Sequence, residues 1–105
     1  MRAQRFALEL PVRYRRIGEA EWLDGKTENI SHSGVLFHAG QALGIDTPVE
    51  IRIALRVATP AGTGSEVICR ARIVRAETRP AEPPAAMAAA FSEYQLVPGP
   101  VPSHA

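Results

Sequence analysis

Apolar and polar residues alternate along this chain, and that alternation limits what it can fold into more than any other feature. In residues 6–15 the apolar set takes every second position: Phe6, Leu8, Leu10, Val12 and Tyr14. The same period of two returns in residues 49–57 and 66–76. Because an extended chain points successive side chains to opposite faces, each stretch predicts a β-strand with one buried face.

Three shorter stretches complete a set of about six predicted strands: Trp22–Ile30, Val35–Ala39 and Met87–Tyr94. Residues that favour turns separate the strands, at Gly18 and in residues 31–34, 40–48, 59–65 and 79–84. Six strands at short spacing, with no convincing amphipathic helix, predict an all-β fold. A small antiparallel barrel is the architecture that leaves no sheet edge exposed.

Two segments leave a local alternative open. Asp24-Gly25 could be a hairpin turn, which would split the second strand. Residues 85–90 are rich in alanine and have helix propensity, but they follow Pro83-Pro84 and run into Phe91. We therefore expect a strand there.

Length and composition fit one globular domain. The 105 residues are 46% hydrophobic and 22% charged, with no apolar run near the roughly 20 residues that span a bilayer and no secretory signal. We expect a cytoplasmic protein without membrane insertion. The predicted barrel domain covers residues 1–96, with an N-terminal arginine arm at about 1–5, and the proline-rich residues 97–105 form a flexible tail.

Charge is balanced overall but uneven along the chain. The net charge of +1 argues against a partner such as DNA or RNA, which a strongly basic surface binds. The first 16 residues nevertheless hold five arginines against the single acid Glu9: Arg2, Arg5, Arg13, Arg15 and Arg16. Arginine suits bidentate and stacking contacts with phosphates and bases, although a GC-rich genome would also enrich it.

Catalytic or metal-binding chemistry has little support in the sequence. Ser31 and His32 are neighbours, so in an extended segment they point to opposite faces and cannot form a dyad. Cys69 falls at an inward strand position, where it is expected to be a small buried hydrophobe. His32 and His38 lack other ligands at a recognised metal spacing. We therefore expect no enzyme activity, no metal and no cofactor.

The segment from Asn29 to Gly34 connects two predicted strands and combines residues suited to a specific task. Asn29 and Ser31 can hydrogen-bond to nearby backbone, and Gly34 tolerates a positive φ. A well-made turn would account for all three residues, and so would a ligand-binding turn. The pattern alone leaves both readings open.

The order of motifs along the chain favours the interpretation of this segment as a ligand-binding turn. An arginine-containing segment, Arg2-Ala3-Gln4-Arg5, precedes a strand, and a second strand leads into Asn29-x-Ser31-x-x-Gly34. This arrangement resembles the PilZ domain family, whose signature is Arg-x-x-x-Arg followed by Asp-or-Asn-x-Ser-x-x-Gly. Residues 67–79 and 87–94 look like the family's last two strands. The resemblance implies a six-stranded split barrel, with the family's C-terminal helix short or absent here, that binds the bacterial second messenger cyclic di-GMP.

The resemblance implies a ligand site of Arg2, Arg5, Asn29, Ser31 and Gly34. One departure concerns its first motif, because the position four residues before Arg5 is Met1. Two explanations stay open: Arg2 substitutes for the missing arginine, or the true chain starts further upstream. Arginine can bind phosphate, the guanine O6/N7 edge and a base plane. Asn29 would accept from the guanine N1 and N2 donors through its amide oxygen, more weakly than a carboxylate.

Three functions follow as hypotheses. The first is a signalling receptor for cyclic di-GMP that acts through a protein partner or self-association. The second is a degenerate PilZ-like adaptor that binds no nucleotide and works through protein contacts, which Met1 favours. The third, a barrel for single-stranded nucleic acid, needs surface aromatics, and most of the six in this chain are expected in the core.

Overall fold

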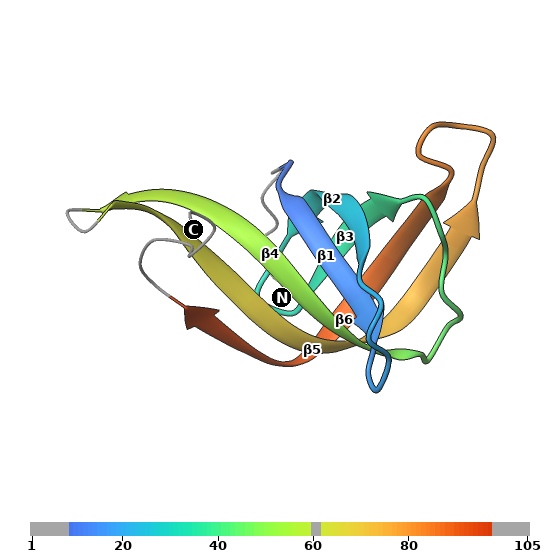
Figure 1. The fold of residues 1–105 in the computed structure, drawn as a ribbon. Helices are drawn as coiled ribbons and strands as arrows, with labels where there is room; N and C mark the ends of the chain where they lie inside the picture. Colours follow the sequence, from blue (N-terminus) through green and yellow to red (C-terminus); the bar gives the residue numbers. More distant parts are fainter. Residues whose placement is uncertain (1–8, 60–61, 98–105) are drawn as a thin grey trace.

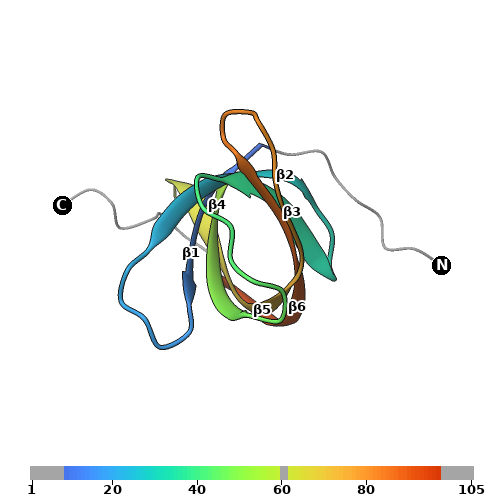
Figure 2. The same ribbon diagram turned by 90° about the vertical axis from the view of Figure 1, so that its right-hand side faces the viewer.

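Six antiparallel strands form a closed barrel in the computed structural model, which describes residues 9–59 and 62–97. The strands are β1 (Pro11–Arg16), β2 (Leu23–Ile30), β3 (Gly34–Ala39), β4 (Pro48–Thr59), β5 (Gly62–Thr78) and β6 (Ala85–Val97). They close in the order β1-β2-β3-β6-β5-β4 (Figure 1), and Figure 2 shows the ring end on. The described residues contain no helix. The predicted all-β barrel is confirmed.

The barrel interior holds the alternate apolar positions that the sequence pattern selects. Tyr14 of β1 and Phe37 of β3 are fully buried, and their rings meet edge to face with centroids 5.1 Å apart. Ile51, Ile53 and Cys69 line the same core from β4 and β5. Burial of one face on each strand is what the period of two requires.

Both local alternatives are resolved in favour of strands. Asp24 and Gly25 lie within β2, opposite Arg13 and Val12 of β1, so no turn splits this strand. Residues 85–90 pair with β3 on one side and β5 on the other.

The ends of the chain bear on the predicted domain limits. β1 begins at Pro11, and β6 extends to Val97. The Phe6 and Leu8 part of the predicted first strand, the arginine arm and residues 98–105 of the predicted tail lie outside the described residues.

β4, β5 and β6 are longer than the other strands and project beyond the barrel (Figure 1). Past Ala90, β6 pairs with β5 but no longer with β3. Three apolar side chains in this part of β6 are exposed: Tyr94, Leu96 and Val97.

In the described part of the chain, no helix has the length and apolarity to cross a membrane.

Candidate ligand-binding site

The turn between β2 and β3 is held together by Ser31. Its backbone N–H donates to the Gly34 carbonyl oxygen at 2.9 Å. Its Oγ accepts from the Ser33 N–H at 3.2 Å and lies 3.1 Å from the Ser33 Oγ. Because only 5% of Ser31 is exposed, its hydroxyl serves the shape of the turn.

Gly34 begins β3 at a point of close contact between strands. A Cβ built there would lie 2.5 Å from the carbonyl oxygen of Ala89, closer than any real Cβ contact. Gly34 does not adopt the positive φ that a glycine tolerates; among the described residues Gly18 is the glycine with that conformation. The glycine is therefore required by the close packing of β3 against β6. It is not required by a left-handed backbone conformation.

Asn29 faces the outside of the barrel because of a β-bulge. Thr27 pairs with Phe37 and Asn29 pairs with Leu36, so Glu28 is an extra residue in β2. Thr27 and Phe37 are buried. Strict alternation would have pointed Asn29 inward with Thr27, and the bulge reverses its direction. Asn29 thus lies on the outer wall, directly before the Ser31 turn.

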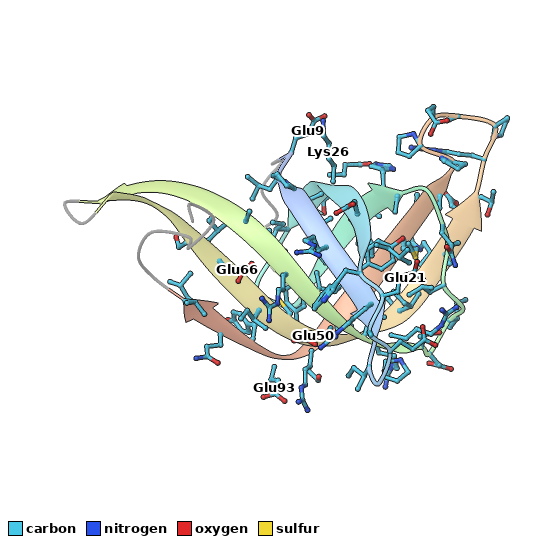
Figure 3. The ribbon with its side chains drawn as sticks, in the orientation of Figure 1. Glu9, Glu21, Lys26, Glu50, Glu66 and Glu93 are labelled. Atoms are coloured by element: carbon cyan, nitrogen blue, oxygen red, sulfur yellow. The ribbon has the colours of Figure 1, made fainter. Side chains whose placement is uncertain are left out.

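The chain enters the barrel beside this strand. The Leu10 carbonyl oxygen accepts from the Thr27 N–H at 2.9 Å, and the Leu10 N–H donates to the Thr27 Oγ1 at 2.9 Å. Figure 3 shows Glu9 near Lys26 of β2. Arg2 and Arg5 lie outside the described residues, so the structure brings together Asn29, Ser31 and Gly34 of the predicted site.

At the end of the β2–β3 hairpin away from the turn, a hollow of about 760 Å³ opens on the outer side of β2 and β3, with Glu9, Lys26 and Arg79 in its lining. His38 of β3 connects two of its walls. Its Nδ1 accepts from Arg79 Nη2 at 2.8 Å, and its Nε2 lies within hydrogen-bond distance of Glu28 Oε1. Sequence reasoning missed this group, since the three residues come together only through strand pairing.

Two buried side chains in the barrel core, Cys69 and Tyr14, are held in their protonated forms. Desolvation raises the pKa of Cys69 to about 12, so its thiol stays protonated and weakly nucleophilic. Burial also raises the pKa of Tyr14 to about 12, and its hydroxyl donates to the Gln41 carbonyl oxygen at 2.7 Å. The expected burial of Cys69 is confirmed.

The fold and the turn define a small antiparallel β-barrel module with Asn29 on its outer wall and Ser31 within the adjoining turn. The PilZ domain model matches residues 1–95, and this chain belongs to the PilZ domain family. PilZ domains are in general non-catalytic receptor or adaptor domains for cyclic di-GMP.

Comparison of structures agrees with this fold. The structure of the Bacillus subtilis inhibitor of motility, MotI/DgrA, superposes with a TM-score of 0.70 at 18% sequence identity. The match covers 90% of this chain and 44% of that one, so this chain spans less than half of the other protein. No curated protein sequence matches this chain significantly.

Proposed function

We propose that this chain is a bacterial cytoplasmic receptor domain for cyclic di-GMP and that it catalyses no reaction. The β2–β3 hairpin is the observation that carries the proposal. In a chain of the PilZ family, it presents Asn29 on the outer wall beside a turn that Ser31 and Gly34 build.

The proposed contacts follow from the chemistry of the ligand. Cyclic di-GMP carries two phosphates and two guanines. Arg5, with Arg2 in place of the missing first arginine, would donate to phosphate oxygens or to the guanine O6/N7 edge. The Asn29 amide oxygen would accept from guanine N–H groups. Leu10 is anchored to Thr27, so the segment before it starts two residues from Asn29 along β2.

Ser31 has a different role from the one its motif suggests. Its Oγ already accepts from the Ser33 N–H, so it would position the turn more than it contacts the ligand. A Ser31→Thr variant keeps the hydroxyl, whereas Ser31→Ala removes it. We expect Ser31→Ala to weaken nucleotide binding and Ser31→Thr to retain more of it.

Isothermal titration calorimetry with cyclic di-GMP tests the proposal. We expect saturable binding by the wild type, and binding about tenfold or more weaker in Arg5→Ala and Asn29→Ala, the size of a lost hydrogen bond to a charged or buried partner. Cyclic di-AMP, which lacks the guanine edge, is the ligand control. Absence of heat together with unchanged NMR spectra at millimolar cyclic di-GMP would refute the receptor.

The alternative is an adaptor that acts through protein contacts without nucleotide. Its support is the end of β6, where Tyr94 is 56% and Leu96 57% exposed. Open strand edges with apolar side chains are sites of β-strand pairing between proteins. A concentration-dependent dimer in sedimentation equilibrium that Leu96→Lys abolishes would support self-association, and a strictly monomeric wild type would oppose it.

A further inference from the structure

A single row of side chains crosses the outer wall of four adjacent strands. Asn29 of β2 pairs with Leu36 of β3, Leu36 with Ala88 of β6, and Ala88 with Arg75 of β5. Residues directly opposite in antiparallel strands point to the same face of the sheet. Asn29 and Arg75 therefore stand at the two ends of one row.

A second β-bulge sets the direction of Arg75. Ala71 and Ile73 of β5 are buried, so strict alternation would send Arg75 into the core as well. The register shifts between Ile73 and Arg75, and Val74 is the extra residue. Arg75 consequently faces outward and is exposed. Each end of the row is thus turned outward by its own bulge, a device that often re-aims side chains beside functional sites.

Between its two ends the row carries the apolar side chain of Leu36 and the small side chain of Ala88. Its floor consists of Leu36 and of alanines at alternate positions of β6: Ala86, Ala88 and Ala90. Three interstrand steps of about 4.8 Å, roughly 14 Å along the curved wall, separate Asn29 from Arg75. A dinucleotide-sized ligand can lie across such a floor with polar groups at both sides.

Arg75 has a guanidinium available for an anion. Among the described residues, no carboxylate oxygen lies within 4 Å of it. The neighbouring Arg72 pairs with Asp46 at 3.5 Å, but both side chains are more than 60% exposed, so this pair is weak. A hollow of about 230 Å³ beside Arg75 is lined by Leu36, His38 and Arg75 and also by Glu28, Glu77 and Arg79, so carboxylates as well as cations face it.

We infer that the nucleotide lies across this alanine floor and that Arg75 binds it from the β5 side, opposite the Asn29 turn. The inference rests on the proposed function and adds a binding residue outside both motifs of the family signature. Arg75 would donate to a phosphate oxygen or a guanine O6/N7 edge. It would supply the cationic contact that position 1 lacks, where Met1 replaces the first motif arginine.

The test compares Arg75→Ala with a matched control, Arg13→Ala. Arg13 is also an exposed arginine with no ion pair among the described residues, but it lies on β1, across the ring from β6 (Figure 2). We expect Arg75→Ala to bind cyclic di-GMP about tenfold or more weakly than wild type, with an unchanged melting temperature without ligand, and Arg13→Ala to bind within twofold of wild type.

A second variant fills the floor. Ala88→Leu adds a larger side chain to the outer face in the middle of the row, so we expect a folded barrel by circular dichroism that has lost nucleotide binding. The Nε–H resonance of Arg75 should also shift on titration of the wild type.

The possible failures are distinguishable. A wild type that binds no cyclic di-GMP would refute the proposed function and this inference with it. A wild type that binds, while Arg75→Ala keeps the same affinity and Ala88→Leu still binds, would leave the receptor standing and overturn the inference alone.

Discussion

Gly34 shows how a motif residue can be fixed by packing. Its Cα faces the Ala89 carbonyl so closely that a methyl group there would lie 2.5 Å from the oxygen. The backbone of β3 or β6 must move to accept any side chain, and the β2–β3 turn would move with it. The geometry of the turn and the packing of the barrel therefore both depend on a glycine at this position.

We expect Gly34→Ala to lower the free energy of unfolding by about 1–3 kcal/mol, the usual cost of overpacking, in urea denaturation. The control is Gly40→Ala, since a Cβ at Gly40 would meet no atom within 4 Å. Equal stability of the two variants would contradict the close approach of β3 and β6.

Cys69 and Tyr14 make the barrel sensitive to alkaline pH. The unfolded chain releases the Cys69 proton near a pKa of 9.0, whereas the folded chain holds it until about 12. Ionisation is therefore easier in the unfolded state, and stability present below pH 9 is lost as pH rises toward 12. The Tyr14 hydroxyl acts in the same direction from 10.0 to about 12.

We accordingly expect the free energy of unfolding to fall between pH 9 and 11, and to fall less steeply in Cys69→Ala than in wild type, as measured by urea titration at each pH. A Cys69→Ala slope equal to that of the wild type would show that the thiol does not contribute.

At the scale of elements, the sequence pattern predicts the strands well because burial of one face imposes a period of two. It predicts the β2–β3 turn for the same reason, since the turn residues interrupt that period. Asn29 and Arg75 could not be placed on one wall from the pattern, because a bulge in each strand reverses the face that alternation assigns. Which side chains share a row on the wall depends on how strands far apart in the sequence pair, and the pattern alone does not show that pairing.

The His38 group illustrates the same limit and allows a test of its own. Arg79 can only donate, so His38 Nδ1 must accept. The His38 proton is then on Nε2, and this N–H donates a hydrogen bond to Glu28 Oε1. We expect ¹⁵N NMR to show the neutral Nε2–H tautomer, and Arg79→Ala to shift the tautomer equilibrium. A dominant Nδ1–H form in the wild type would contradict this geometry.

At the scale of the whole molecule, the barrel divides its surface between two walls. The wall of β1 and β4 carries Arg15, Arg13 and Arg52, whose guanidinium carbons lie 4.3, 5.4 and 5.3 Å from the Trp22 ring centroid. Arg15 pairs with Glu50 of β4 at 2.8 Å and Arg52 with Glu66 of the neighbouring β5 at 3.7 Å, which balances part of the charge there. The opposite wall, with the alanine floor and the motif turn, is the one proposed to bind nucleotide.

A ligand that binds only the folded barrel must stabilise it. At free cyclic di-GMP of about 100 times its Kd, we expect a gain of about 2.7 kcal/mol and a rise of several degrees in Tm. Differential scanning fluorimetry measures this shift, which should disappear with cyclic di-AMP. An equal rise with both nucleotides would indicate nonspecific binding.

The most direct measurement is a ¹H–¹⁵N NMR titration of the wild-type chain with cyclic di-GMP. Binding across the outer wall predicts saturable shifts in residues 29–34 and around Arg75, with the amides of Val12–Arg16 unchanged. Spectra that do not change at millimolar nucleotide, or saturable shifts confined to β1 and β4, would contradict the account.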